Sequence, residues 1–453
     1  MNKPREQWGS KIGFILAAAG SAVGLGNIWR FPYLAGQNGG AAFIFVYIIC
    51  VIAIGIPVLI AEILIGRTAQ KNPVGSFKML TTSKFYHGIG GMGVVAGFII
   101  LSFYSVVAGW TIGYLYEAIT GSLLNYEVAA EASNHFFVLT HDPVWNVALL
   151  IVFMFLTMGI VYFGVQKGIE LGSKIMMPLL FVLLVGLMIY GLTLEGAFKG
   201  LDYLFNPDWS KINSDVILAA LGQAFFSMSL GMGAMLTYGS YLTKKDNIPA
   251  SSVWIAFLDT SVAIIAGICI FSVVFATGQS PDVGPSLIFR TLPVVFAKMP
   301  GGHYFAIFFF FALSLAALTS TVSLLEVVTA YFVDEKGWKR KNAVVVFGTL
   351  VTLLGIPSAL SFNALENFKI LGKTFFDLTE FISSNLMLPI GGFFIAIFVG
   401  WLWGFDKVKE LVKEGSEKLF DRLPWLMDFW KIILRFVAPV LIIIVLLSSI
   451  GIL

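Results

Sequence analysis

The chain has 453 residues, of which 58% are hydrophobic and only 12% are charged, and its mean hydropathy is +0.88. Soluble domains carry about 25% charged residues, so this composition argues against a soluble enzyme, a nucleic-acid-binding protein and a disordered chain. The formal net charge of +3 is too small to indicate a polyanionic partner. The two cysteines, Cys50 and Cys269, lie within apolar segments, so we expect no disulfide framework. These features predict an all-α polytopic membrane protein.

Apolar segments follow one another along the chain, and each is long enough to cross a bilayer, which takes about 20 residues. The eleven segments occupy residues 12–36, 41–66, 88–120, 144–163, 168–192, 214–242, 250–278, 302–333, 342–361, 373–403 and 427–453. The first has a basic start like a signal peptide, but it is too long and contains Arg30, so we expect a retained helix. Residues 1–453 are therefore predicted to form one transmembrane domain.

The connecting loops predict the orientation of these spans. Lysine and arginine gather in the loops on the side of the amino terminus, above all at residues 336–341 and 407–422. Because positive loops mark the cytoplasmic face, the amino terminus is predicted to be cytoplasmic and the carboxyl terminus extracellular. The outer loop at 279–301 is expected to fold back over the protein as short helices. The inner stretch at 404–426 is either an amphipathic helix on the membrane surface or a solvated linker.

Spans 1 and 6 both contain clustered glycines. Span 1 reads GSAVGLGNIWRFP at residues 20–32, and span 6 reads GQAFFSMSLGMG at residues 222–233. Close helix packing would account for the glycines alone. However, paired interruptions at equivalent places in two groups of five spans indicate a transporter site. The spans are accordingly predicted to form two inverted repeats, at about 12–192 and 214–403, followed by an eleventh span at about 427–453.

Polar side chains accompany these interruptions. Asn27, Arg30 and Ser227 would be costly if they faced lipid, so they must find partners inside the protein. Span 7 adds Asp259, and span 8 adds a run of hydroxyl groups at residues 319–323. Oxygen ligands without sulfur or imidazole suit a hard cation rather than zinc or copper.

Two segments carry a resemblance to a known family. Residues 5–40 read REQWGSKIGFILAAAGSAVGLGNIWRFPYLAGQNGG, and residues 222–241 read GQAFFSMSLGMGAMLTYGSY. The first resembles the first-helix signature of the neurotransmitter:sodium symporters, and the second resembles their sixth helix. These transporters are among those on which the generalisation about broken helices is based. The number of spans is typical of a prokaryotic subgroup of amino-acid transporters. The resemblance implies sodium-coupled uptake of neutral, hydrophobic L-amino acids by alternating access in the cell membrane.

The resemblance also implies two bound sodium ions. One ion would share the substrate's carboxylate as a ligand, so that substrate and ion each raise the other's affinity. The two protein ligand sets are Ala22, Asn27, Ser227 and Asp259, and Gly20, Val23, Ala316, Thr319 and Ser320.

The implied substrate site lies between the two broken helices. The binding residues are Ala22, Leu25, Gly26, Ile100, Tyr104, Phe226, Ser227, Ser229, Met232, Ser320, Ser323 and Leu324. Ser21 departs from the asparagine that relatives often carry there. Because Met232 is deformable and apolar pockets discriminate weakly by size, several neutral hydrophobic substrates are expected, without one being fixed.

Alternating access implies a closure on each side of the site. The gate residues are Arg30, Glu380 and Phe226 on the outside, and Arg5, Asp334, Trp8, Ser240 and Tyr241 on the inside. Arg30 would pair with Glu380, with Asp377 as the rival partner, and Arg5 would pair with Asp334.

Span 5 contains Gly168 and Pro178, a spacing that predicts a helix able to unwind. Proline lacks an amide hydrogen and glycine weakens a helix, so opening this end would admit water to the second sodium site. A simple proline kink is the alternative. Elsewhere, Glu62 is expected to accept hydrogen bonds from orphaned amides of span 6, and Glu326 to join a water path or a proton step.

Asp259 replaces the asparagine usual in this family, and Ala263 stands one helical turn later, where chloride-independent relatives usually carry an acid. We expect the carboxylate to balance the cation charge, which would remove any chloride requirement and permit proton antiport. A neutral, protonated Asp259 is the alternative. The competing functions are an ion channel and a sodium-independent amino-acid carrier. No enzyme activity and no nucleic-acid partner are expected; the partners are the lipid bilayer and a small amino acid, and the oligomeric state stays open.

Overall fold

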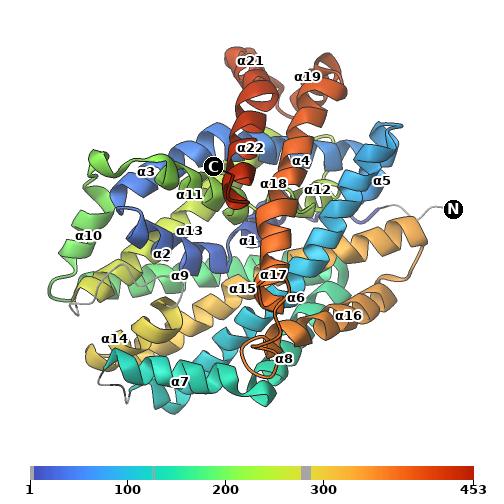
Figure 1. Cartoon of the computed structure of the whole chain (residues 1–453). Coiled ribbons are helices and arrows are strands. Elements are labelled where there is room, and N and C mark those ends of the chain that lie inside the picture. The colour runs from blue at the N-terminus through green and yellow to red at the C-terminus, as the bar shows by residue number, and fades with distance from the viewer. Residues whose placement is uncertain (1–4, 125, 127, 277–286, 453) are drawn as a thin grey trace.

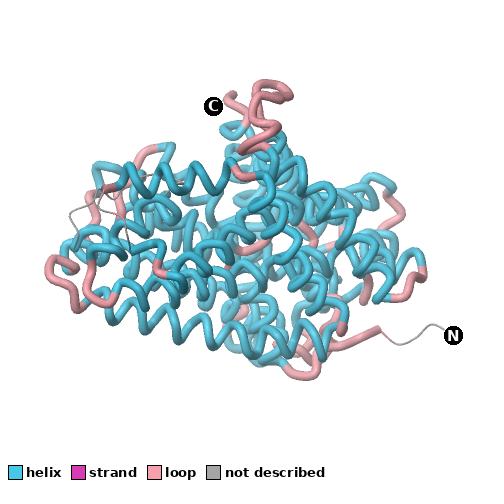
Figure 2. Tube along the Cα trace, turned by 90° about the horizontal axis from the view of Figure 1, so that it is seen from below, coloured by secondary structure: helices cyan, strands magenta, loops and turns pink. Residues whose placement is uncertain are grey.

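The computed structural model describes residues 5–124, 126, 128–276 and 287–452, and this part of the chain is built of helices (Figures 1 and 2). Its one strand-like pairing is an isolated bridge between Ile370 and Lys373. The predicted all-α class is therefore confirmed.

Most of the predicted spans are single long helices. Within the described residues, nine helices are long and apolar enough to cross a membrane: α3–η2–α4 (Ala41–Ala69), α6 (Lys84–Thr120), α8 (Pro143–Tyr162), η4–α9 (Val165–Leu192), α13 (Ile248–Ala276), α15 (Gly302–Lys336), α16 (Arg340–Leu360), α17–η8–α18–η9 (Phe375–Leu402) and α21–η10–α22 (Trp425–Ser449). Span 7 was predicted to reach residue 278, and its last two residues lie outside the described part.

Span 1 is broken where the sequence predicts it. Helix α1 (Lys11–Ala22) ends at Val23, whose backbone is extended, and the chain resumes as the π-helical turn η1 (Gly26–Arg30) and α2 (Phe31–Gln37). The two parts are bent by 52° relative to each other. The backbone groups at this break lack helical partners and are free to bind other groups.

Span 6 is divided in the same way. Helix α11 (Ser214–Ser227) ends before a non-helical stretch, and α12 (Ala234–Gly239) follows it. Within the stretch, Ser229 and Gly231 have left-handed φ values of 53° and 81°, which end a right-handed helix. A Cβ on Gly231 would lie 2.1 Å from the Leu388 carbonyl oxygen, so this position requires glycine on both counts.

The two broken spans lie inside the bundle. Helix α1 packs against α9, α13 and α15, and η1 packs against α11 and α13. Long helices from spans 5, 7 and 8 thus surround the first break and hold polar backbone at membrane depth away from lipid, which such backbone requires.

Short helices cover the ends of the bundle: α5 (Pro73–Leu80), α7 (Ala129–His141), α10 (Phe198–Phe205), α14 (Leu292–Lys298), α19 (Phe405–Lys413) and α20 (Glu417–Arg422). In the predicted outer loop, residues 277–286 lie outside the described part. The remainder forms η7 (Leu287–Thr291) and α14, whose Val294 and Phe296 are buried, so the prediction of short covering helices is confirmed there.

The stretch between spans 10 and 11 is helical and packs on the protein. Val408 and Val412 of α19 are buried, and α19 is amphipathic, with its lysines on the outer face. The guanidinium of Arg67, at the end of α4, donates to the carbonyl oxygens of Leu411 and Glu414 and also to that of Asp246, the last two at 2.9 and 3.0 Å. Helices α19 and α21 rise beyond the other elements at the top of Figure 1, whereas α22 runs from α21 down into the bundle.

Candidate functional site

Spans 1, 6 and 7 meet in a buried polar cluster. The Ser227 hydroxyl lies 2.9 and 2.8 Å from the two carboxylate oxygens of Asp259, and the Asn27 side-chain amide donates to the same carboxylate at 2.8 Å. The Tyr47 hydroxyl lies 3.4 Å away. Asn27 and Asp259 are fully buried, and a buried carboxylate is costly without such partners. The cluster therefore holds a carboxylate at membrane depth beside the two breaks.

A side-chain amide binds a cation through its oxygen, but the Asn27 side chain presents its nitrogen to the carboxylate. Its nitrogen faces Asp259 and Ser227, whereas its oxygen accepts the Gly24 amide at 3.1 Å. The carboxylate in front of it explains this, because an acceptor favours the donor end of the amide. Ligation of a cation by the oxygen requires the amide to turn over, which exchanges the two ends.

A second group of oxygens lies between spans 1 and 8. The hydroxyl groups of Thr319 and Ser320 lie 3.4 and 3.2 Å from the Val23 carbonyl oxygen, and the Thr319 hydroxyl also donates to the Ala316 carbonyl at 2.9 Å. Gly20 lies against this group, since a Cβ there would be 3.1 Å from Thr319 Cβ. The structure thus brings the second set of expected ligands together.

A small cavity of ≈ 30 Å³ lies between the two breaks. It is lined by Ser21, Ala22, Gly24, Gly26, Ile100, Tyr104, Phe226, Ser227, Ser229, Met232, Ser320, Ser323 and Leu324. Every expected substrate residue except Leu25 is among them. The Leu25 amide donates to the Tyr104 hydroxyl at 2.9 Å, and Leu25 lines the larger cavity above.

Two of these lining residues, Gly24 and Ser21, were not among the predicted binding residues, although Ser21 was noted as a departure from the asparagine of relatives. A Cβ on Gly24 would lie 2.4 Å from Ser320 Oγ and 2.6 Å from the Tyr104 hydroxyl oxygen, so only glycine fits. The Ser21 hydroxyl donates to Ser323 Oγ at 2.7 Å and closes one side of the cavity. The position of Gly24 in the sequence could have indicated its role, because it lies between Val23, a predicted sodium ligand, and Leu25, a predicted substrate-binding residue.

The apolar wall of the cavity is formed by buried side chains of spans 3, 6 and 8. Ile100, Met232 and Leu324 are each no more than 5% exposed. The Phe226 ring lies over the first break, because a Cβ on Gly26 would approach its ring carbons to 3.1 Å. Gly26 therefore allows the aromatic ring to lie directly on the broken helix.

The expected outer gate differs in its contacts. Arg30 lies with its guanidinium 4.8 Å from the centre of the Phe226 ring, a cation–π contact. Among the ion pairs between described residues there is none that joins Arg30 to Glu380 or to Asp377. All three line a cavity of ≈ 350 Å³ above the Phe226 ring, together with aromatic side chains such as Trp110. The predicted pair is therefore not formed in this conformation.

The expected inner gate residues are in contact. Arg5 forms an ion pair with Asp334, donates to the Ser240 hydroxyl at 2.6 Å, and lies with its guanidinium 4.6 Å from the centre of the Tyr241 ring. The Trp8 amide donates to the Tyr241 carbonyl at 3.2 Å. The side of the bundle that carries the amino terminus is therefore closed by a connected set of side chains.

Span 5 covers the second group of oxygens. A Cβ on Gly20 would lie 3.2 Å from the sulfur of Met177, the residue before Pro178. Pro178 lies inside α9, and Gly168 lies in the π-helical turn η4 (Val165–Glu170). A Cβ on Gly168 would be 2.0 Å from the Ile160 carbonyl oxygen, so this glycine also permits close packing of spans 4 and 5.

Two further buried acids, Glu62 and Glu326, have specific partners. Glu62 accepts the Gly231 amide at 2.7 Å, which confirms that it binds an amide of the broken span 6. Glu326 accepts the Tyr241 hydroxyl at 2.5 Å and two hydrogen bonds from Arg340 at 2.6 and 2.9 Å. Glu326 therefore belongs to a charged network next to the inner gate.

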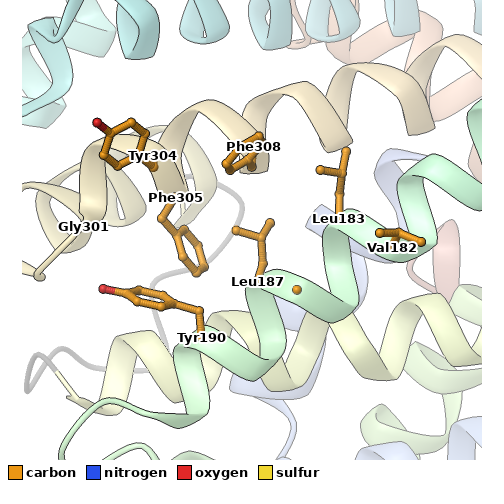
Figure 3. Close-up of a pocket in the computed structure, with 9 residues that line it drawn as sticks. Val182, Leu183, Leu187, Tyr190, Gly301, Tyr304, Phe305 and Phe308 are labelled. Carbon is orange, nitrogen blue, oxygen red and sulfur yellow. The ribbon is translucent and has the colours of Figure 1, made fainter.

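A larger groove of ≈ 410 Å³ lies elsewhere, between α9 and α15 (Figure 3). Its lining is Val182, Leu183, Gly186, Leu187, Tyr190, Gly301, Tyr304, Phe305 and Phe308. None of the expected site residues belongs to it, and its walls are almost wholly apolar. Polar chemistry is concentrated at the breaks of spans 1 and 6 instead.

The sequence is similar to those of known sodium-dependent transporters. A sequence profile described as the sodium:neurotransmitter symporter family matches residues 5–136 and 140–452. The chain is 41% identical to the "uncharacterized sodium-dependent transporter YhdH" of Bacillus subtilis (strain 168), over 99% of this chain and 98% of that protein. It is 34% identical to an "uncharacterized sodium-dependent transporter" of Haemophilus influenzae, over 99% of each chain.

A solved structure is similar over nearly the whole chain. It is the crystal structure of MhsT in complex with L-phenylalanine, which is 49% identical to this chain, with a TM-score of 0.89. The match covers 98% of this chain and 100% of MhsT.

Proposed function

The chain belongs to the sodium:neurotransmitter symporter family, and from this premise we propose that it couples sodium entry to the uptake of neutral, hydrophobic L-amino acids. It is a multi-pass, sodium-dependent membrane transporter rather than an enzyme. The observation that carries the substrate class is the cavity at the two breaks, which combines non-helical backbone and hydroxyl groups on one side with the buried side chains of Ile100, Met232 and Leu324 on the other.

The substrate's charged groups would bind the broken helices. The Leu25 and Gly26 amides, at the start of η1, and the Tyr104 hydroxyl, which lies 2.9 Å from the Leu25 amide, would hold the carboxylate. Carbonyl oxygens at the end of α11, near Phe226 and Ser227, would accept the ammonium group. Opposite the Phe226 ring, the apolar wall would contact the side chain. The complex of MhsT with L-phenylalanine supports an aromatic or large aliphatic substrate.

Two sodium ions would travel with the amino acid. The first would bind at Ala22, Asn27, Ser227 and Asp259, after the Asn27 amide has turned over, and would share the substrate's carboxylate. The second would bind between spans 1 and 8, where neutral oxygens suit a small ion that must also leave quickly. A shared ligand makes the affinities of ion and substrate interdependent, which is the physical basis of coupling.

The Asp259 carboxylate would supply the counter-charge. Two sodium ions and a zwitterion bring net positive charge into a low-dielectric site, and unbalanced charge is costly there. With a carboxylate at residue 259 and alanine at residue 263, we propose that transport does not require chloride and that Asp259 can carry a proton on the return step.

The transport cycle would alternate between closures at the two ends of the bundle. We place the amino terminus in the cytoplasm, in accordance with the basic loops on that side. The contacts of Arg5 with Asp334 would then close the cytoplasmic path, and the Phe226 ring with Arg30 would close the outer one. Spans 1–5 and 6–10 would act as inverted repeats, with their broken first members at the centre.

Uptake by proteoliposomes tests this function. Purified protein reconstituted with an inward sodium gradient should accumulate radiolabelled L-phenylalanine, and replacing sodium by potassium should abolish accumulation. Sodium-independent exchange would identify a carrier instead, and ion current without accumulation would identify a channel. Preferential uptake of lysine or glutamate would contradict the proposed substrate class.

A further inference from the structure

The first residues of the described chain, 5–10, form a strap that is held from two sides. Its contacts with spans 6 and 8 are those of the inner gate. On the other side, the Val165 amide donates to the Glu6 carboxylate at 3.0 Å, and the Gln166 side chain donates to the Gln7 carbonyl at 2.8 Å. The strap is thus bound to the first turn of span 5 as well as to the gate.

Glu170 makes the most intimate contact between span 5 and this strap. Its side chain is buried, and its two carboxylate oxygens accept the Gly9 amide at 2.6 Å and the Ser10 hydroxyl at 2.9 Å. A Cβ on Gly13 would lie 2.2 Å from the carboxylate, so α1 begins directly on it. Lys174, one turn later on span 5, pairs with the same carboxylate at 2.7 Å.

Helix α1 does not need this carboxylate to begin. The Ser10 hydroxyl already accepts the Gly13 amide at 3.0 Å, which is a complete N-cap for α1. The carboxylate of Glu170 therefore serves to join two elements rather than to start one. Because water can replace Gly9 and Ser10 as its partners, the junction can break and re-form.

The junction depends on the part of span 5 that the Gly168 and Pro178 spacing predicts to unwind. Glu170 is the last residue of η4, between those two positions. When residues 165–174 leave the helix, the carboxylate moves away from Gly9 and Ser10. We infer that Glu170 is a positioning residue that makes unwinding of span 5 and release of the strap a single event. The inference rests on the proposed alternating-access function. Within that function, Glu170 couples the unwinding of span 5 to the release of the strap.

Hydrogen–deuterium exchange of the full-length protein in lipid nanodiscs tests the coupling. Trp8→Ala removes the indole hydrogen bond to the Tyr238 carbonyl, at 3.0 Å, and loosens the strap from span 6 without touching span 5. It should raise amide exchange at residues 165–174 by at least about fivefold, because coupled elements open together. In a Glu170→Ala background the same substitution should raise exchange at 165–174 much less, since most of the coupling is lost with the carboxylate and only the contacts of Glu6 and Gln7 with span 5 remain.

The control is Lys174→Met, which removes the ion pair but leaves both hydrogen bonds to the strap. Exchange at residues 9–16 should stay at the wild-type rate in this variant and rise in Glu170→Ala. Should Glu170→Ala fail to fold, Glu170→Gln keeps the size of the side chain and should show a reduced coupling. An equal effect of Trp8→Ala with and without Glu170 would overturn the inference. Failure of wild-type phenylalanine uptake would count against the proposed function alone, because the exchange measurement needs no substrate.

Discussion

The Ser227 hydroxyl lies 2.8 and 2.9 Å from the two carboxylate oxygens of Asp259, so a single acid on span 7 is bound directly to the end of α11. Any cation that binds between spans 1 and 6 meets this carboxylate. In the proposed function, the charge balance of substrate and ion binding depends on this residue.

Removal of the Asp259 charge should create a requirement for an external anion. Wild-type uptake should be equal in chloride and gluconate. Uptake by Asp259→Asn should be at least about tenfold lower than wild type in gluconate, since an uncompensated buried charge costs more than about 1.4 kcal/mol, and chloride should restore part of it. Sodium-driven uptake in the two media measures this. The exposed acid Asp208, changed to asparagine, is the control. Strong stimulation of the wild type by chloride would contradict the proposal.

A methyl group at Gly24 should prevent substrate binding. The added Cβ would lie 2.4 Å from Ser320 Oγ, and overpacking of this kind costs about 1–3 kcal/mol, so Gly24→Ala should weaken phenylalanine binding by about tenfold or more. Gly222→Ala is the matched control, because nothing lies within 4 Å of a Cβ there. Equilibrium binding of radiolabelled phenylalanine to both variants gives the answer. Equal affinities would argue against the cavity as the binding site.

Selectivity for substrate size should depend on Met232. Met232→Ala enlarges the cavity, so the affinity for tryptophan relative to that for alanine should rise by about tenfold. A change of this size in relative affinity is usual when an apolar pocket gains or loses a small group. Met235 is equally buried but does not line the cavity, so Met235→Ala should lower stability without changing the ratio. Competition binding with the two amino acids measures the ratio. An unchanged ratio in Met232→Ala would exclude this side chain from substrate contact.

Turnover should depend on the proline of span 5. Pro178→Ala restores a helical amide and should slow transport several-fold, because unwinding becomes harder. Sodium-dependent phenylalanine binding should stay near wild type, since the ligands themselves are unchanged. Pro357 lies inside α16 and provides the control, as Pro357→Ala should not slow transport. A wild-type rate in Pro178→Ala would favour the simple kink.

The sequence alone was sufficient for the helical class and for the places of both breaks. Polar residues such as Asn27 and Asp259 cannot face lipid, and glycine clusters at equivalent positions identify backbone that leaves the helix. The cavity lining, apart from Ser21 and Gly24, was instead implied by the family resemblance. The hydrophobic pattern predicts where along a span a side chain lies. The family resemblance predicts which spans contact one another.

Orientation of side chains was beyond reach of the sequence. The Asn27 amide turns its nitrogen to Asp259 because of a hydrogen bond that no spacing encodes. Arg30 lies on the Phe226 ring instead of pairing with Glu380, although all three residues line the same cavity. Such contacts differ between the conformations of a transporter. One sequence encodes all of these conformations, so it does not show which contacts are formed in any one of them.

Because Arg67 donates hydrogen bonds to the last turn of α19, a spectroscopic label on that helix should move together with span 2. Although α19 follows span 10 in the chain, its carboxyl end is fastened to span 2 by the Leu411 and Glu414 carbonyls. A fluorophore or spin label on the exposed residue Lys409 should therefore report displacements of span 2. Distances measured from that label to span 5 would then follow the opening of the cytoplasmic side without any probe inside the transport path.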